Sequence, residues 1–281
     1  MASSASQRIL VRTRDAGPAV LAFADHLQAI SGYPTALVLD TGNGAVAPAS
    51  HSVVELSRQR CAELNLYCPH DFAWRCGDYG LYLARRRFPQ VEHFWMIETD
   101  VRFYGPGASG FFRFFDDKKD VDFLAADLRP SDASWYWNGM ALARNARPFR
   151  CLFPVTRLSS GAIDAAFKHR VTQGKKVRRR VVWPNDEALV ATTLMNEGFR
   201  CHDFNDFGET FYSPETFYYG RPLDGDHFEP ALQSVQMIHP ILFGEEYIAK
   251  VSLLEKPAPA EPWLTVKLRK AAYEANCRLR W

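Results

Sequence analysis

Apolar residues in the first part of the chain form two short continuous runs, and the segment between them has the periodicity of a helix. Residues 8–13 (RILVRT) and 35–44 (TALVLDTGNG) contain apolar runs that end in turn signals, a pattern typical of buried strands. Between them, residues 19–30 place apolar side chains three or four positions apart, after Pro18 and before Gly32, which predicts a helix. A strand, a helix and a strand in this order predict a βαβ unit, and therefore a parallel sheet.

Similar patterns continue to about residue 205. Further strands are expected at residues 65–69, 93–100, 120–127 and 199–205. Further helices are expected at residues 78–89, 110–117, 159–171 and 185–198. The last of these begins at Asn185, a good N-cap residue, and ends at Gly198. We therefore expect an α/β fold with a mostly parallel central sheet flanked by helices.

The C-terminal part of the chain has a different pattern. After about residue 205 it is rich in aromatic residues, proline and glycine, which predicts an irregular portion that wraps the sheet. Residues 255–262 (EKPAPAEP) predict a proline-rich linker, followed by a basic terminal helix. The expected organisation is one domain over residues 1–254, with the linker and helix at residues 255–281.

Composition and charge exclude several classes of protein. The net charge is only +2 and charged residues make up 23% of the chain, so we expect no nucleic-acid partner. The six cysteines form no CxxC pair, which favours reduced, packing cysteines and a cytoplasmic protein. The N-terminus has no signal-peptide pattern, and no apolar run reaches the length of a membrane span.

Two carboxylates mark the end of the strand predicted at residues 93–100 (HFWMIETD). Glu98 and Asp100 occupy alternate positions, so their side chains point to the same side of a strand. Like charges this close are stable together when a cation lies between them, and hard oxygen ligands suit Mg²⁺ or Mn²⁺. The alternative is that the acids bind loop amides or pair with Arg102. Asp40 ends a neighbouring strand, and ligands of open parallel sheets bind at such ends.

The sequence around this acidic pair resembles a known class of enzymes. The pattern W-x-x-E-x-D-x-R-x-x-G is formed here by Trp95, Glu98, Asp100, Arg102 and Gly105. It resembles a family of uncharacterised glycosyltransferase-like proteins, and residues 8–240 as a whole resemble the GT-A class of nucleotide-sugar glycosyltransferases. The resemblance implies a GT-A-like, Rossmann-related fold, with a donor-binding part over about residues 8–127 and an acceptor-binding and catalytic part over about 128–254.

The resemblance also implies a metal site and a catalytic base. Asp100 and Glu98, with His239 from the run MIHPIL, would hold the Mn²⁺ or Mg²⁺ that bridges the donor diphosphate. Because Glu98 stands where Asp is commoner, the alternatives are that it would reach the metal through water or contact the ribose instead. An isolated histidine in an apolar run is also often a core residue. Asp186 or Glu187, at the start of the helix after WPN, would be the base of an inverting transfer, although acids also favour a first helical turn by charge alone.

The remaining site residues bind the donor and the acceptor. The donor-binding set implied by the resemblance is Thr13, Arg14, Asp15, Asp40, Asp78, Glu98 and Asp100. Ser160 and Gly161 offer backbone amides to an anion on the acceptor side, or simply cap a helix. Trp135, Tyr136 and Trp137 offer aromatic faces to a sugar ring, or form a structural cluster. The acceptor would be a saccharide or a lipid-linked saccharide.

A basic run at residues 174–180 (GKKVRRR) is either a solvated loop or a patch for a phosphate-bearing substrate. With the basic C-terminal helix, it also allows peripheral contact with an anionic membrane on the cytoplasmic face. A nucleotidyltransferase is disfavoured because RTRDAGPA after the first strand holds only one glycine, and a dehydrogenase because no GxGxxG follows either early strand. A nucleotide- or carbohydrate-binding domain without catalysis remains an alternative to the expected glycosyltransferase.

Overall fold

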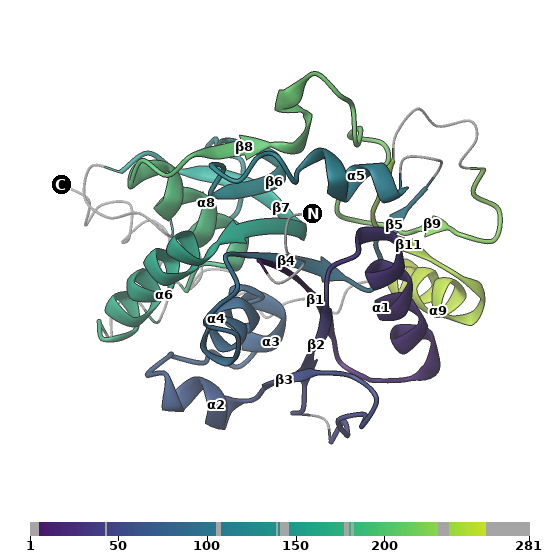
Figure 1. The fold of residues 1–281 in the computed structure, drawn as a ribbon, viewed down its shortest axis with the longest axis horizontal. Coiled ribbons are helices and arrows are strands. Elements are labelled where there is room, and N and C mark those ends of the chain that lie inside the picture. The colour runs from purple at the N-terminus through teal and green to yellow at the C-terminus, as the bar shows by residue number, and fades with distance from the viewer. Residues whose placement is uncertain are drawn as a thin grey trace. The chain divides into compact units, whose positions relative to one another are not determined.

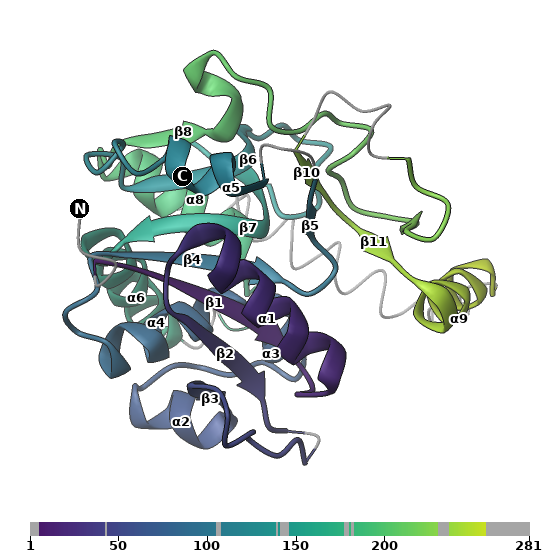
Figure 2. The same ribbon diagram turned by 45° about the vertical axis from the view of Figure 1, so that its right-hand side comes forward.

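The computed structural model describes residues 6–42, 44–104, 108–138, 140, 146–176, 180, 183–229 and 236–256. The chain divides into two compact units, both drawn as ribbons in Figures 1 and 2. The first unit contains residues 1–99 and 112–203, and the second contains residues 100–111 and 204–281.

A seven-stranded sheet forms the centre of the first unit. Its strands are β1 (Gln7–Thr13), β2 (Thr35–Asp40), β3 (Val53–Leu56), β4 (His93–Glu98), β6 (Phe123–Pro130), β7 (Phe149–Ser159) and β8 (Cys201–Asp203). They follow the order β3-β2-β1-β4-β7-β6-β8. Strands β1 to β4 pair in parallel, as do β6 and β8, whereas β7 is antiparallel to both of its neighbours. The predicted α/β class with a mostly parallel, helix-flanked sheet is confirmed, and it is consistent with the expected GT-A-like fold.

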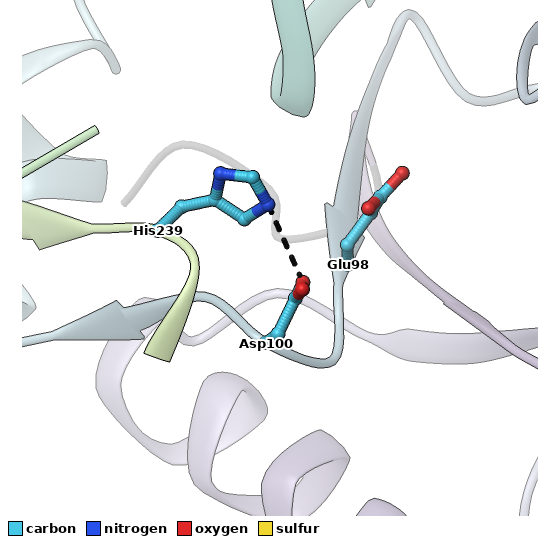
Figure 3. A group of neighbouring side chains, drawn as sticks. All are labelled: Glu98, Asp100 and His239. Carbon is cyan, nitrogen blue, oxygen red and sulfur yellow. Dashed lines mark ion pairs between the residues drawn. The ribbon is translucent and has the colours of Figure 1, made fainter. Parts of the chain in front are cut away.

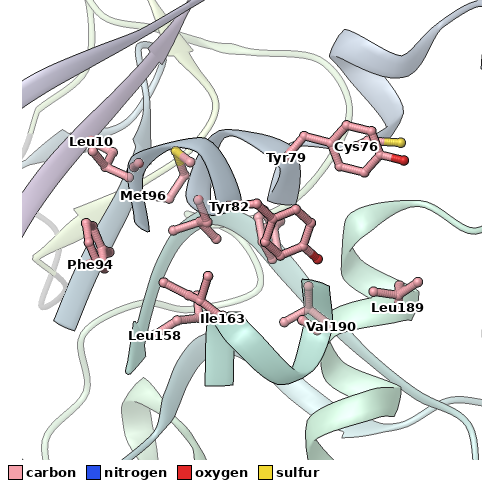
Figure 4. Close-up of a cluster of buried hydrophobic side chains, with 14 of the residues drawn as sticks. Leu10, Cys76, Tyr79, Tyr82, Phe94, Met96, Leu158, Ile163, Leu189 and Val190 are labelled. Carbon is pink, nitrogen blue, oxygen red and sulfur yellow. The ribbon is translucent and has the colours of Figure 1, made fainter. Parts of the chain in front are cut away.

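Helices cover both faces of this sheet. They are α1 (Pro18–Ser31), α2 (Arg58–Glu63), α3 (Phe72–Arg75), α4 (Asp78–Arg87), α6 (Ser160–Gly174) and α8 (Asp186–Asn196). Figure 4 shows Leu10, Phe94 and Met96 of the sheet packed with side chains of α4, α6 and α8 in one buried cluster. Helix α1 packs on β1 and β2 from the other side (Figure 1). Burial on both faces explains why the central residues of β1, β2 and β4 form continuous apolar runs.

Most predicted elements of this unit are confirmed, but one predicted strand is wrong and two strands, β3 and β7, were not predicted. Residues 65–69 form no strand, and the third parallel strand is the shorter β3. The eleven-residue strand β7 was missed, although it lies beside β4 at the centre of the sheet. Its sequence contains Pro154 and two arginines, which obscure the apolar pattern. One of them, Arg157, is buried and donates hydrogen bonds to the carbonyls of Phe115, Lys118 and Val121.

The second unit is built from short elements. These are β5 (Arg102–Phe103), β9 (Leu223–Asp224), β10 (Met237–Ile238), β11 (Ile241–Leu242), the 3₁₀ turn η1 (Phe204–Phe207) and α9 (Gly244–Glu255). Strand β10 pairs with β5, and β11 pairs with β9. Ile238 and Ile241 form a small core of their own. Helix α5 (Ala108–Phe114) begins in this unit and ends in the first one.

The predictions about the linker and the terminal helix concern residues that the structure describes only in part. Residues 257–281 lie outside the described part of the chain, so the basic terminal helix and most of the proline-rich linker stay predictions. The division into donor-binding and acceptor-binding parts also stays a prediction. Within the described residues, no helix is both long enough and apolar enough to cross a membrane.

Candidate active site

The sheet of the first unit has a point where the strand order reverses. From β1 the chain adds β2 and then β3 on one side, whereas β4 joins β1 on the other side. In open α/β sheets, ligands bind beyond the carboxyl ends of the strands at such a point. Here those ends are formed by Arg12 and Thr13 of β1 and by Glu98 of β4. We call this the β1/β4 edge.

Arg12 connects the charged groups of the β1/β4 edge. It lies opposite Glu98 in the strand register, and its Nη1 is 2.7 Å from the Glu98 carboxylate and 3.7 Å from that of Asp186. Its Nη2 donates hydrogen bonds to the carbonyls of Ala73 and Trp74. Burial lowers the pKa of Arg12, but the surrounding acidic groups, Glu98 and Asp186 foremost, together outweigh it and raise that pKa overall. Glu98 is therefore paired with Arg12.

Asp186 is the first residue of α8 and is almost fully buried. Asn185 caps this helix, as predicted, by accepting a hydrogen bond from the Ala188 amide. The Asp186 carboxylate accepts a hydrogen bond of 2.8 Å from the backbone N–H of Gly77. Burial raises the pKa of Asp186 to about 7; Arg12 opposes the rise and the neighbouring acids add to it. A carboxyl group that titrates near neutral pH is suited to general base catalysis.

Gly77 allows Arg12 and Asp186 to approach each other. A Cβ at this position would lie 2.3 Å from Nη1 of Arg12 and 2.5 Å from Oδ2 of Asp186. Every residue other than glycine would therefore displace one of the two side chains. Neither Arg12 nor Gly77 was predicted as a site residue. The available signals were an arginine inside an apolar strand and a glycine directly before the helix at residue 78.

Glu187, the other candidate base, has different surroundings. Its carboxylate accepts a hydrogen bond of 2.8 Å from the Asn185 side chain. Burial raises the pKa of Glu187 well above its ordinary value, and the adjacent Asp186 raises it further. The surroundings of Glu187 therefore favour its protonated form, whereas Asp186 has the positive charge of Arg12 beside it.

The loops after β1 and β2 carry most of the other predicted donor-binding residues. Thr13 donates a hydrogen bond to the Asp15 carbonyl, and the Asp15 carboxylate accepts one from the Gly17 amide. Arg14 is exposed between them. Asp40 closes a similar turn by accepting from the Gly42 amide. Since β1 and β2 are parallel, both loops lie at the same edge of the sheet as Arg12.

Asp78 was also predicted to bind the donor, but it is fully buried. Its two oxygens lie 2.7 and 2.9 Å from the Arg170 guanidinium, and the Tyr82 hydroxyl donates a further bond of 2.6 Å. Neither Asp78 nor Arg170 has any exposed surface. These contacts account for Asp78 as a structural residue, so a donor contact by Asp78 stays a prediction without structural support.

The predicted acceptor residues fall at two different edges of the sheet. Trp135, Tyr136 and Trp137 follow β6, which runs in the same direction as β4, so they lie on the side of the sheet where Glu98 is found. The tyrosine is 56% exposed. In contrast, the Ser160 amide binds the carbonyl of Glu92, directly before β4 begins. Ser160 and Gly161 are therefore separated from Glu98 by the length of β4, roughly 20 Å.

The predicted metal ligands Asp100 and His239 lie together in the second unit, as Figure 3 shows. His239 Nε2 is 3.6 Å from Oδ1 of Asp100, and the histidine side chain is only 4% exposed. The His239 amide binds the Thr216 carbonyl at 2.8 Å, and its ring contacts Phe217. The Asp100 carbonyl accepts a hydrogen bond from the amide of Ile241. A buried imidazole and a carboxylate in this arrangement form a donor pair that suits a divalent metal ion.

Comparisons with solved structures include a distant similarity. No protein-family model matches the sequence, and no curated protein matches it either. A solved structure described as a glycosyltransferase involved in the glycosylation of the major capsid of PBCV-1 aligns with 89% of this chain and 99% of its own. The two chains are 10% identical, and the TM-score is 0.40. A similarity this distant identifies neither a family nor an activity, so the function has to be argued from the residues.

Proposed function

We propose that this protein is a metal-dependent glycosyltransferase that uses a nucleotide-diphosphate sugar as donor and a saccharide or lipid-linked saccharide as acceptor. The observation that carries the proposal is the group formed by Arg12, Glu98 and Asp186 at the β1/β4 edge. This is the position where open α/β sheets bind nucleotides, and it combines a buried acid of raised pKa with the acidic motif of residues 98–100. The resemblance of residues 95–105 to glycosyltransferase-like proteins supports the same assignment.

Asp100 and His239 are the proposed metal ligands, and Glu98 is the proposed third. Glu98 is only two residues before Asp100 in the chain, which keeps both carboxylates within reach of one ion. The presence of an imidazole favours Mn²⁺ over Mg²⁺, because Mg²⁺ prefers a shell of oxygen ligands. When bound, such a metal acts as a Lewis acid that stabilises the diphosphate leaving group.

The side chains of the first unit then prepare the acceptor. Asp186 is the proposed base, because its pKa is raised to about 7 and it takes the acceptor hydroxyl proton in an inverting transfer. Arg12 and the Gly77 amide hold the Asp186 carboxylate in one orientation. Tyr136 is the most exposed of the three neighbouring aromatic residues and is the proposed stacking surface for an acceptor sugar.

A screen of nucleotide sugars by thermal shift, with and without Mn²⁺, tests this proposal. We expect one donor to raise the melting temperature only when Mn²⁺ is present. The Asp100→Asn variant should lose this shift, whereas Asp186→Asn should keep the shift and lose sugar transfer by about 100-fold or more. Mn²⁺-independent binding, or full activity of both variants, would overturn the assignment.

Two alternatives give distinct outcomes in the same screen. Donor binding without hydrolysis or transfer to any acceptor would indicate a binding domain without catalysis. Release of pyrophosphate from a nucleoside triphosphate and a sugar phosphate would indicate a nucleotidyltransferase.

A further inference from the structure

The first unit contains a cavity of about 490 Å³ that shares no lining residue with the β1/β4 edge. It lies between α2, the segment at residues 65–68 and the C-terminal end of α6. Arg58, Lys175 and Arg180 line it, and none of the described residues that line it is acidic. Cavities of this size are typical of small-molecule sites.

Arg58 is held in place by neutral groups. Its guanidinium donates hydrogen bonds of 2.9 Å to the carbonyls of Cys68, Pro69 and His70. It also lies 4.9 Å from the centre of the Phe72 ring. These contacts fix the side chain without cancelling its charge, because carbonyl oxygens carry no net charge.

Arg180 is held in a similar way on the other side of the cavity. Its Nε donates a hydrogen bond of 2.8 Å to the Gly174 carbonyl, and its guanidinium lies 4.8 Å from the centre of the Tyr67 ring. The Tyr67 ring in turn packs edge-on against the buried Trp183. Within the described part of the chain, no acidic side chain pairs with Arg58, Lys175 or Arg180.

We propose that this cavity binds the phosphate or diphosphate group of a small molecule. Two arginines with fixed side chains present planar N–H donors, which match phosphate oxygens, and Lys175 adds a third positive charge. A dianion would neutralise the charges that the fold leaves unpaired. The site gives a role to Lys175 and Arg180, which lie near the two ends of the basic run at residues 174–180. The proposed glycosyltransferase reaction does not use this run. It does not depend on that reaction.

Titration calorimetry with inorganic pyrophosphate in the presence of EDTA tests the site. EDTA removes divalent metal, so binding at the proposed metal site does not contribute. We expect the Lys175→Gln/Arg180→Gln double variant to bind about tenfold more weakly than the wild type. The matched control is Lys168→Gln/Lys176→Gln, which removes two exposed charges from the same stretch outside the cavity and should bind within about twofold of the wild type.

Three outcomes would overturn the proposal. They are no binding by the wild type, an equal loss in both double variants, and a loss in Asp186→Asn while Lys175→Gln/Arg180→Gln binds normally. The single variant Lys175→Gln guards against misfolding, because this side chain is exposed and makes none of the holding contacts. Flotation with vesicles containing phosphatidic acid identifies the source of the group: vesicle binding that depends on Lys175 and Arg180 assigns a lipid headgroup, and pyrophosphate binding alone assigns a soluble ester.

Discussion

At the scale of single residues, Gly77 is the position with the least tolerance for a side chain. The Gly77→Ala variant would place a methyl group 2.3 Å from Arg12 Nη1 and 2.5 Å from Asp186 Oδ2. Because both of those side chains are held by other contacts, we expect a loss of about 1–3 kcal/mol of unfolding free energy, measured by urea denaturation. The matched control is Gly110→Ala in α5, where a Cβ would meet nothing within 4 Å. This control should be neutral or stabilising, by up to about 1 kcal/mol. Equal stability of Gly77→Ala and wild type would contradict the packing described here.

A second residue-scale prediction concerns pH. His93 is buried, and its burial, with the nearby charge of Arg157, lowers its pKa from 6.5 to about 4. Between these values the unfolded chain binds a proton at this position and the folded protein does not. Stability should therefore fall as the pH decreases from about 6.5 to 4, by up to about 3 kcal/mol. The His93→Gln variant should show a flatter dependence of unfolding free energy on pH over that range, whereas removal of the exposed His26 should leave the slope unchanged.

The residue scale also shows what the sequence could not predict. The E-x-D motif, Asp186 and His239 were predicted as site residues because the sequence around them resembles the GT-A class. Arg12 was missed because an arginine inside a short apolar strand has the same pattern as an exposed charge. Only the strand register places Arg12 opposite Glu98, where the two side chains form an ion pair.

At the scale of elements, the ion pair of Asp78 and Arg170 joins α4 to α6. Arg170 also donates a hydrogen bond to the Pro184 carbonyl, just before α8 begins. The Asp78→Asn variant leaves a buried guanidinium without its counter-charge, so we expect a loss of about 3–5 kcal/mol of unfolding free energy. The same two helices provide a matched control in the exposed pair of Arg85 and Asp164. Asp164→Asn should cost less than about 1 kcal/mol. Similar losses in the two variants would show that the buried pair is not the main connection between the helices.

Elements with a strong local signal were predictable, and those defined by long-range contacts were not. Helices α1 and α8 carry their own start and stop residues, and β4 is a continuous apolar run. Strand β7 instead depends on its partners, because the carbonyls of residues 115–121 compensate its buried Arg157. Ser160 and Gly161 were grouped with the acceptor site by resemblance. Without β7, nothing in the sequence showed that α6 begins at the other end of β4 from Glu98.

At the scale of the whole molecule, the chain passes from one unit to the other between Thr99 and Asp100, within the acidic motif. Sequence patterns identify this motif but cannot assign its members to units, because unit boundaries depend on contacts between distant segments. The long return of the chain through residues 204–256 supplies His239 to the unit that contains Asp100. A metal bound there would thus connect two distant segments of the second unit, the one that follows β4 and the C-terminal one.

Metal binding to the second unit gives the last prediction. The buried pair of His239 and Asp100 should bind Mn²⁺ in the folded protein only, so free Mn²⁺ at about 100 times its dissociation constant should add about 2.7 kcal/mol of stability. EDTA should remove this gain, and the His239→Gln variant should never show it, as measured by thermal unfolding. The same unit offers a control in His227, which lies 2.9 Å from Asp224 but has an 84% exposed side chain. His227→Gln should keep the full response, because an exposed histidine–carboxylate pair remains hydrated and gains little from replacing water with a metal. A response that persists in both His239→Gln and Asp100→Asn would place the ion elsewhere, and with it the binding site of the donor diphosphate.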